Sequence, residues 1–389
     1  MTKHDFLLAA VLVSGLLPGC GGTSAETAAF AEDPAKLLSD PALLAEPGSL
    51  ALANGRTSPV YVAKRGEYQF NLHSYLTRFD GKFWAIWSSG LTDEDSNGQV
   101  IRYASSEDGH QWSEGKVLAA DPDGDGPGSW IARGVFVAEG RMTALLAYFE
   151  ARPRVPGGPP SWPGLRLMRY ECDGTGWSEM GLFADDCMNN YPPRKLGEKW
   201  FMTCRDTFRK MYTAQSPDLA NGNWTITPLP LKAPQDNMSE PSWYLDPEGL
   251  AHLIFRDQGR SGYLRQSVSS DFGATWTPPV LTNYPDATSK NFTGRLSNGW
   301  YFLINNPRQK GRDPLAITFS RDGWTFSNPL ALRKDAPAQR FAGRSKGPKS
   351  FQYPHAIEHG GSLWVIYSTN KEDIEISEFP ISDLGLGGE

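Results

Sequence analysis

The chain has 389 residues, a formal net charge of -6 at pH 7 and a sequence pI near 5.6. This acidic balance argues against nucleic acid as a partner, because nucleic-acid-binding domains present basic surfaces. The 13 Trp residues suit both strand packing and stacking on sugar rings. The sequence shows no glycine-rich phosphate loop and no Ser-His-Asp nucleophile elbow, so we expect no cofactor.

Residues 1–20 are typical of an export signal. Lys3 and His4 precede an apolar run, residues 6–17, that is too short to span a bilayer as a helix. The segment Leu17-Pro18-Gly19-Cys20 resembles the bacterial lipobox, in which the Cys is lipidated and becomes the mature N-terminus. We expect an exported lipoprotein of the outer membrane, on its periplasmic or cell-surface side, held by the lipid alone. The alternative is a plain secretory signal from which Cys20 is discarded.

Residues 21–56 are rich in Ala, Gly, Pro and Ser and show no sustained apolar period. This composition predicts a flexible tether, with room for a short helix near residues 35–44. The remaining residues, 57–389, are many for an ordinary domain but natural for a propeller or a barrel. We expect this part to be one folded unit and a monomer.

Three further cysteines lie in the folded part, at Cys172, Cys187 and Cys204. Export makes a disulfide feasible, and either Cys172 with Cys187 or Cys187 with Cys204 can pair, leaving one thiol over. No two of them have the spacing of a metal site with nearby His, so we expect no structural metal.

A turn of the form S-x-D-x-G-x-T-W recurs along the chain. Its full copy is residues 269–276, in which Ser and Asp bond the turn's own backbone, Gly supplies positive φ and Trp packs on the sheet. Residues 105–112 (SSEDGHQW) keep it with Glu107 at the Asp position, and residues 320–326 (SRDGWTF) keep it one residue shorter. Fainter copies are residues 216–224 and 171–177. Such turns join antiparallel strands.

The chain beyond residue 56 alternates strands and turns with almost no helical period. A strand-opening segment, a turn and an aromatic-rich strand recur at residues 71–88, 129–148, 190–205, 240–256, 291–305 and 353–368. Each interval of about 50 to 60 residues holds four short strands, the content of one propeller blade. We predict an all-β, six-bladed β-propeller, with seven blades as the alternative. The last blade has three strands of its own, so residues 58–63 (SPVYVA) should supply its fourth and close the ring.

Six blades with these turns resemble the sialidase (neuraminidase) superfamily over nearly all of residues 60–380. In that family a catalytic Glu opens a strand and an Arg of the substrate-binding triad ends the next, positions that Glu240 and Arg256 match. A second triad Arg corresponds to Arg312, in NNPRQKGRDPLAITFS. The family's nucleophilic Tyr opens the inner strand of the last blade, where Tyr353 stands.

The chemistry of this set follows from the residue types. A glycosidase stabilises an oxocarbenium-like transition state and supplies an acid to the leaving oxygen. A Tyr with a pKa near ~10 is a poor nucleophile until a carboxylate such as Glu240 takes its proton. Arg256 and Arg312 can grip a substrate carboxylate through charge-assisted hydrogen bonds. The resemblance places the acid/base in the acidic loop Asp93-Glu94-Asp95, and we assign it to Asp95.

The first inner strand departs from the family pattern. The family reads aromatic-Arg-Ile-Pro-Ser there, whereas this chain reads Phe70-Asn71-Leu72-His73-Ser74, so Asn71 replaces a triad Arg. Strict specificity for sialic acid is therefore not expected. His73 is an imidazole at the mouth of the ring and can act as acid or base near neutral pH. This points to sialidase-like relatives acting on uronic-acid polysaccharides, in which His73 or His355 would work with Tyr353.

Further polar residues open or end the inner strands, and some of them must line the channel. They are Arg133, Asn190, Tyr191, Arg194, Arg205, Asn291 and Arg295. We assign Arg133, Arg194, Arg295 and His355, with Asn71, to substrate binding. The sequence thus predicts an exo-acting glycoside hydrolase on acidic oligo- or polysaccharides. The alternatives are a polysaccharide lyase or rhamnosyl-glucuronate hydrolase, and a glycan-binding propeller without catalysis.

Overall fold

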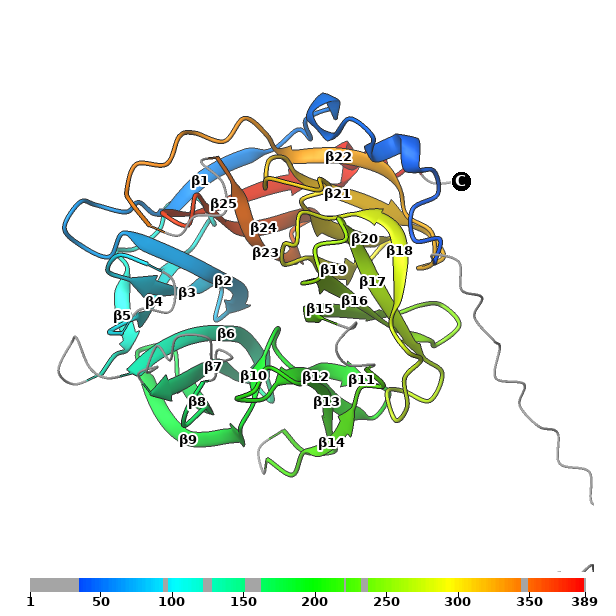
Figure 1. The fold of residues 1–389 in the computed structure, drawn as a ribbon. Coiled ribbons are helices and arrows are strands. Elements are labelled where there is room, and N and C mark those ends of the chain that lie inside the picture. The colour runs from blue at the N-terminus through cyan, green and yellow to red at the C-terminus, as the bar shows by residue number, and fades with distance from the viewer. Residues whose placement is uncertain are drawn as a thin grey trace, which may run out of the picture. The chain divides into compact units, whose positions relative to one another are not determined.

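The computed structural model describes residues 35–93, 97–121, 128–150, 162–219, 222–231, 237–343 and 349–387. Their strands form six antiparallel sheets arranged around a central axis (Figure 1). The prediction of an all-β, six-bladed propeller is confirmed. No helix among these residues is both long and apolar enough to cross a membrane.

The first three blades, each given from its inner to its outer strand, follow the chain. Blade 1 consists of β2 (Phe70–Phe79), β3 (Lys82–Gly90), β4 (Val100–Ser106) and β5 (Lys116–Ala119). Blade 2 consists of β6 (Gly128–Ala138), β7 (Arg141–Glu150), β8 (Arg166–Cys172) and β9 (Trp177–Asp185). Blade 3 consists of β10 (Met188–Asn189), β12 (Lys199–Arg205), β13 (Met211–Ser216) and β14 (Thr225–Pro228), and β11 (Arg194–Leu196) also pairs with β12.

The other three blades repeat the arrangement. Blade 4 consists of β15 (Met238–Leu245), β16 (Ala251–Asp257), β17 (Tyr263–Ser269) and β18 (Val280–Pro285). Blade 5 consists of β19 (Phe292–Arg295), β20 (Tyr301–Asn305), β21 (Leu315–Ser320) and β22 (Ser327–Arg333). Blade 6 consists of β23 (Phe351–His359), β24 (Ser362–Thr369), β25 (Asp373–Pro380) and β1 (Arg56–Tyr61).

Blade 6 combines the two ends of the folded chain. β1 pairs antiparallel with β25, with Arg56 opposite Glu378 and Ser58 opposite Ile376. The ring is therefore closed by hydrogen bonds between its first and last strands, as the sequence predicted for residues 58–63. Closure of this kind leaves no gap at which the first and last blades can separate.

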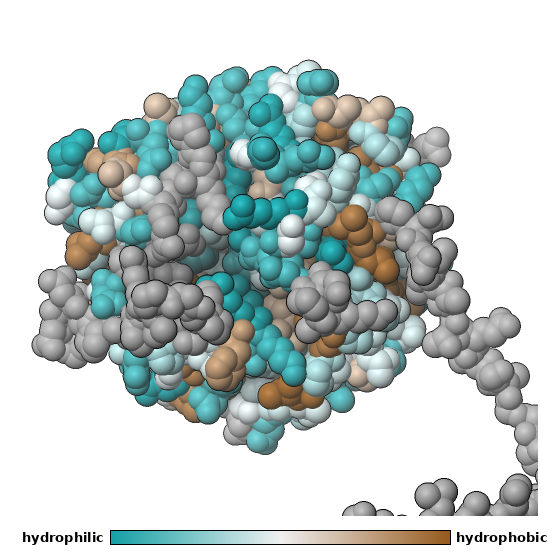
Figure 2. Space-filling model, in the orientation of Figure 1, coloured by the Kyte–Doolittle hydropathy of each residue, from teal (hydrophilic) through white to brown (hydrophobic). Residues whose placement is uncertain are grey.

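The second strand of each blade is buried on both faces, because each blade packs between two neighbours. β16 and β24 are buried at every position, and each has an apolar run at its centre, Leu253–Phe255 and Leu363–Tyr367, as strands covered on both sides do. The outer strands differ, since β9 and β14 are mostly exposed or half-buried. The space-filling view shows a hydrophilic surface around the centre of the face in Figure 1 (Figure 2).

The recurring turns join the third and fourth strands of the blades. In blade 4, Asp271 accepts hydrogen bonds from the Ser269 hydroxyl (2.7 Å) and the Thr275 backbone N–H (2.8 Å). In blade 1, Asp108 makes the corresponding bonds to Ser106 and to the backbone of the turn. The prediction that Glu107 takes the Asp position is wrong, because the turn begins at Ser106 and is one residue shorter.

Residues 35–53 belong to the packed fold, which corrects the prediction of a flexible tether for this part of 21–56. Leu37 and Leu38 are fully buried, and they share an apolar cluster with residues of blades 4 and 5. Isolated bridges join Leu38 to Phe326 and Leu52 to Ala331. The leucines, which the Ala- and Pro-rich composition obscures, supply the apolar surface that holds the segment. The expected helix is reduced to two 3₁₀ turns, η1 (Pro41–Leu44) and η2 (Pro47–Ser49), and a third, η3 (Ile381–Leu384), follows blade 6.

Cys187 and Cys204 form a disulfide with a Cα–Cα distance of 5.2 Å, the second of the two pairings left open by the sequence. Cys172 is a buried free thiol. The disulfide ties the start of blade 3 to the end of β12, next to Arg205. Cys20 lies outside the described residues.

Candidate active site

Four inner strands contain a β-bulge near their start. Each bulge changes the direction of one side chain relative to the regular strand. The pairing register shifts in β2, β6, β15 and β23, at or beside His73, Arg133, Glu240 and Tyr353. His73, Glu240 and Tyr353 have φ of 53°, 52° and 56°, which bulky residues adopt only where the surroundings impose it. Bulges re-aim side chains in this way next to active sites.

The bulge at Arg133 depends on a glycine. Gly134 has φ of 150°, and a Cβ at this position would lie 2.5 Å from Cγ of Pro192. A larger residue would therefore push blades 2 and 3 apart. The close approach fixes the backbone that carries Arg133.

Glu240 is surrounded by cations. Its Oε2 accepts a hydrogen bond from Nη1 of Arg256 at 2.5 Å, and its Oε1 lies 3.7 Å from Nη2 of Arg205. Burial by itself would raise the pKa of Glu240, but the charges of Arg256, Arg205 and Lys290 outweigh it and hold the pKa well below its usual range. Glu240 is thus ionised at neutral pH and locked by its partners.

Lys290 is a buried member of this group that the sequence did not single out. Its Nζ donates to the Tyr75 hydroxyl (2.8 Å) and to the backbone oxygen of Asn190 (3.1 Å). It also lies over the rings of Tyr75 and Tyr191, at 4.6 Å and 4.2 Å from their centroids. Burial lowers its pKa well below the usual range, against the attraction of Glu240. The sequence pattern pointed only to the adjacent Asn291, because a loop Lys carries no signal of burial.

The loop that carries Lys290 is held by another buried acid. Asp286 accepts hydrogen bonds from the Ser289 backbone N–H and hydroxyl, both at 3.0 Å. Burial raises the pKa of Asp286 to about 6 despite these bonds. The role of this carboxyl is to fix the turn that leads into β19, and the sequence did not indicate it.

Arg133 adds a further cation with few protein partners. It is 1% exposed, and its Nη2 lies 3.2 Å from the Met188 sulfur. Its Nε and Nη1 have no hydrogen-bond partner among the described residues. Buried donors left unpaired are costly, so such a guanidinium is suited to binding an anion. We call Arg133, Arg205, Arg256 and Lys290 the cation cluster. The three arginines all act electrostatically on Lys290, and Arg205, Arg256 and Lys290 act on Glu240.

His73 and Tyr353 lie next to each other in neighbouring blades. Their ring centroids are 4.7 Å apart in an edge-on contact, and the charge of His73 also acts on Glu240. Tyr353 is 4% exposed, with Arg312 and Lys371 near its ring at 5.8 Å and 5.4 Å from the centroid. The two bulges thus bring together an imidazole and a phenol, the pair that the sequence placed at the mouth of the ring.

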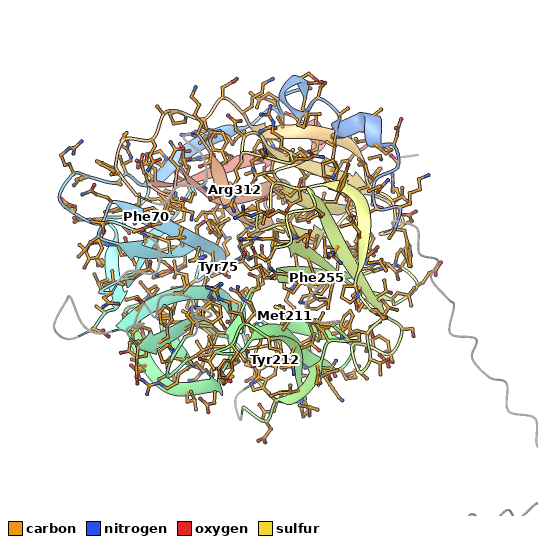
Figure 3. The ribbon with its side chains drawn as sticks, in the orientation of Figure 1. Phe70, Tyr75, Met211, Tyr212, Phe255 and Arg312 are labelled. Atoms are coloured by element: carbon orange, nitrogen blue, oxygen red, sulfur yellow. A yellow bond between two sulfur atoms is a disulfide. The ribbon has the colours of Figure 1, made fainter. Side chains whose placement is uncertain are left out.

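Two predicted binding residues are occupied within the protein. The Asn71 amide donates to the backbone oxygens of Tyr68 and Glu372, at 3.0 Å and 2.8 Å, and accepts from the Ser89 hydroxyl. Asn71 therefore joins blades 1 and 6, and both of its N–H donors are already used within the protein. Arg312 donates to the Gln352 side chain and to the backbone oxygen of Thr288 (2.9 Å). Its side chain points toward the centre of the ring (Figure 3).

His355 is packed among Tyr75, Tyr191 and Phe292. Its Nδ1 accepts a hydrogen bond from the Leu76 backbone N–H at 3.2 Å, which places the proton of the neutral ring on Nε2. Burial, together with the charges of Lys290 and Arg194, lowers the pKa of His355 to about 3. At neutral pH this ring is uncharged and does not offer Nδ1 as a base.

The other predicted site residues lie away from the cation cluster or outside the description. Arg194 donates to the backbone oxygen of Trp243 (2.6 Å) and stacks on its ring at 4.4 Å. Arg295 is exposed at the end of β19 and lies over Tyr301. Asp95 lies outside the described residues, whereas Asp93 is half-buried at the edge of that segment. No group of three or more His, Cys, Asp or Glu among residues that the structure describes is arranged to hold a metal ion.

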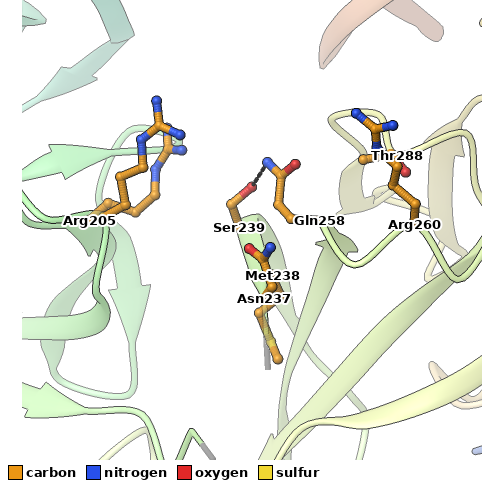
Figure 4. Close-up of a pocket in the computed structure, with 8 residues that line it drawn as sticks. Arg205, Asn237, Met238, Ser239, Gln258, Arg260 and Thr288 are labelled. Atoms are coloured by element: carbon orange, nitrogen blue, oxygen red, sulfur yellow. Dashed lines mark hydrogen bonds between the residues drawn. The ribbon is translucent and has the colours of Figure 1, made fainter. Parts of the chain in front are cut away.

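A cavity of about 180 Å³ is lined by Ser239, which precedes Glu240 in the chain, and by Arg205 (Figure 4). Its wall includes Arg205, Arg209, Arg260 and Gln258, and the Gln258 amide donates to the Ser239 hydroxyl at 2.7 Å. Arg256 reaches the same amide, with 3.4 Å between Nη2 and Oε1. None of its described lining residues is acidic. This cavity therefore connects with the cation cluster and carries the same sign of charge.

Comparisons with known proteins agree with this architecture. The family model described as the BNR repeat-like domain matches residues 81–365. A comparison with curated proteins finds no match. Among solved structures, a sialidase is similar at a TM-score of 0.62 and 21% identity, over 90% of this chain and 35% of that longer chain. A Hadza microbial sialidase gives 0.66 at 16% identity, over 84% and 68% of the two chains.

The intramolecular trans-sialidase from Ruminococcus gnavus has a TM-score of 0.63 at 12% identity, over 85% of this chain and 99% of that one. Likeness at such identities establishes the shared fold, and the family match covers most of the chain. The resemblance predicted from the turns is confirmed. The chain belongs to the BNR repeat-like domain family and has a six-bladed propeller fold like that of the sialidases.

Proposed function

We propose that this protein is a glycoside hydrolase that cleaves acidic glycans. The observation that carries the proposal is the cation cluster, in which Arg205, Arg256 and Lys290 act on one carboxylate, Glu240, and Arg133 adds a charge that acts on Arg205 and Lys290. Buried positive charge in excess of negative charge favours an anionic ligand, and planar guanidinium groups suit a carboxylate or a sulfate. The sialidase-like fold supports sugar chemistry at this place in the ring.

In the proposed reaction the Tyr353 oxygen attacks the anomeric carbon and forms a glycosyl-tyrosine bond. The bond to the leaving oxygen breaks, and that oxygen takes a proton from an acid on the loop at residues 93–95, which we assign to Asp95. Water then cleaves the glycosyl-tyrosine bond, with the same carboxylate as base. The Tyr353 proton passes toward Glu240 in the first step and returns to the phenolate when water releases it in the second, with His73 beside the phenol ring.

The resting pKa of Glu240 explains why an anionic substrate would activate the site. The arginines that depress this pKa would also bind the substrate anion. An anion shared by Arg205 and Arg256 cancels part of their field and so raises the pKa of Glu240. Glu240 then becomes a better acceptor for the proton of Tyr353 only when an acidic sugar is bound.

A second candidate is elimination on a uronic-acid polysaccharide, and the contact between His73 and Tyr353 favours it. A lyase needs a base for the proton α to the carboxylate and a cation to neutralise that carboxylate. His73 is the histidine suited to this work, because His355 is buried with a pKa of about 3. In this reaction no water is added, and the product carries a double bond.

A product assay on a panel of acidic glycans tests the proposal and separates the two reactions. We expect new reducing ends without the ultraviolet absorbance of unsaturated uronate. Reducing ends that rise together with that absorbance would establish elimination and refute hydrolysis. Binding of a glycan without either product would show a glycan-binding propeller and refute both.

Export as a lipoprotein fits a substrate found outside the cell. The proposal rests on the lipobox-like segment that ends at Cys20, with the membrane reached through the lipid alone. A polysaccharide too large to enter the cytoplasm would then meet the enzyme at the outer membrane. Fractionation of cells that express the full chain tests this location.

A further inference from the structure

Two turns of neighbouring blades share the sequence pattern Arg-Asp-x-x-Arg. Residues 205–209 are Arg-Asp-Thr-Phe-Arg and residues 256–260 are Arg-Asp-Gln-Gly-Arg. Each follows the second strand of its blade, β12 in blade 3 and β16 in blade 4. Each of the two adjacent blades therefore carries a pair of arginines at the equivalent point. Three residues separate the two arginines of each pair.

The Asp of each turn fixes its backbone. Asp206 accepts hydrogen bonds from the N–H groups of Phe208 (2.9 Å) and Lys210 (2.7 Å). Asp257 accepts from the N–H groups of Gly259 (3.1 Å) and Ser261 (2.9 Å). Asp257 also pairs with the Arg265 guanidinium, with 3.2 Å between Oδ1 and Nε. The two carboxylates therefore hold the turns in the shape that carries Arg209 and Arg260.

The two arginines of each turn have different surroundings. Arg205 and Arg256 lie inward and contact Glu240. Arg209 and Arg260 are exposed, have left-handed backbone φ of 66° and 60°, and line the cavity of about 180 Å³. The Arg209 guanidinium lies 5.0 Å over the Trp162 ring, which limits its freedom. The repeat thus builds an inner and an outer pair of cations.

The outer pair shares the cavity with groups that suit an oxyanion. Asn237 and Gln258 offer amides there, and no described residue of the lining is acidic. Arg209 is also close enough to Arg205 for their charges to repel each other. An anion between the turns would relieve this repulsion and accept several charge-assisted hydrogen bonds.

We propose that Arg209 and Arg260 form a second anion subsite, next to the one at the cation cluster, and that the substrate is a glycan charged on two neighbouring sugars. This inference rests on the proposed function for its inner subsite. The second charge is a sulfate ester or the carboxylate of the flanking sugar. A single terminal acid on a neutral glycan would leave the outer pair unused.

The subsite is tested first with inorganic sulfate by isothermal titration calorimetry on the full chain. The double variant Arg209→Asn/Arg260→Asn removes both charges, and Asn tolerates the left-handed backbone of both turns. We expect it to bind sulfate about tenfold more weakly or to lose one binding equivalent, because each charge-assisted bond contributes to affinity. Arg321→Asn, at an exposed arginine of a blade 5 turn, is the matched control and should match the wild type. Equal sulfate binding by the double variant and the wild type would overturn the subsite.

Size-matched tetrasaccharides of chondroitin sulfate, intact and desulfated, then identify the charge. If the outer pair binds a sulfate ester, the double variant loses affinity only for the sulfated tetrasaccharide. If it binds a carboxylate, the loss is the same for both. Unchanged affinity for both, or no binding of either by the wild type, contradicts the subsite. Because these readouts follow binding, they remain separate from the product assay, whose failure would refute hydrolysis while leaving the subsite intact.

Discussion

Replacing Glu240 by Gln removes one negative charge from the middle of the cation cluster while keeping the size of the side chain. The carboxylate lies 2.5 Å from an Arg256 nitrogen and 3.7 Å from an Arg205 nitrogen. In the variant these guanidinium groups, with Arg133 and Lys290 nearby, face no carboxylate at this position. Breaking a buried ion pair by removing one partner costs about 3–5 kcal/mol of stability.

The same substitution should separate turnover from binding. Loss of the group that receives the Tyr353 proton is expected to lower kcat about 100-fold or more. Substrate binding should strengthen, because Glu240 repels an anion held by the same arginines. For two charges about 5 Å apart at an effective dielectric constant of about 20, that repulsion is at most about 3 kcal/mol. KM should therefore fall or stay level while kcat falls.

Steady-state kinetics on an acidic glycan that the wild type cleaves provides the measurement. Calorimetric binding of the same glycan and a thermal melt show whether the variant is folded. His73→Ala is the comparison, and under hydrolysis it should act mainly on KM. A Glu240→Gln variant that keeps full kcat, or one that is folded but binds the glycan more weakly, would refute this account of Glu240.

Other expected outcomes concern folding, acid stability and location. A chain that starts at residue 64 lacks β1 and should show no cooperative melt, whereas one that starts at residue 54 should melt at a lower temperature than the intact fold; equal melting of the two would refute closure by β1. Leu38→Ala should lower the free energy of unfolding by about 2–5 kcal/mol in denaturant titrations, and the exposed Leu52→Ala by far less; equal effects would contradict packing of this segment. Hydrogen bonds from its turn lower the pKa of Asp108 to about 2, so its stabilising effect is present above about pH 4 and lost as pH falls toward 2. Asp108→Asn should thus be less stable than wild type at neutral pH and approach it in acid, and a pH-independent difference would exclude this mechanism. Cys20→Ser should release the protein from the membrane fraction, and unchanged retention would rule out the lipid anchor.

The fold was predictable because its signals are local and repeated. The turn at residues 269–276 and its weaker copies mark hairpins whose geometry depends on their own Ser, Asp and Gly. The last blade has only three strands at the C-terminal end of the chain, so a fourth strand had to come from elsewhere. β1 is that fourth strand. The segment at residues 35–53 was missed because its leucines have no period of their own. Their burial depends on surfaces of blades 4 and 5 that are distant in sequence.

The site was predictable only where a residue matched a family position on an inner strand. Glu240 and Tyr353 were named in this way and Arg256 by its match at the end of the second strand, whereas His73 was named where the first inner strand departs from the family. The structure places these residues near one another. Lys290 was missed because its burial is a tertiary property of a loop. The internal bonds that occupy Asn71 and His355 likewise involve partners in other blades or loops, so spacing along the chain does not reveal them.

The equivalent bulges explain how this ring can differ in chemistry from its structural relatives without a change of fold. Each bulge lies near the start of an inner strand, so one substitution there changes the charge that the blade presents while the strand pairing remains. In this chain the bulges present an imidazole, a guanidinium, a carboxylate and a phenol, from His73, Arg133, Glu240 and Tyr353. A triad Arg at the position of Asn71 is absent, but Arg133 contributes a buried guanidinium from the next blade. In the proposed function the anion is therefore held toward blades 2 to 4, where Arg209 and Arg260 also lie. A glycan with one charge or none would leave these two arginines without a ligand.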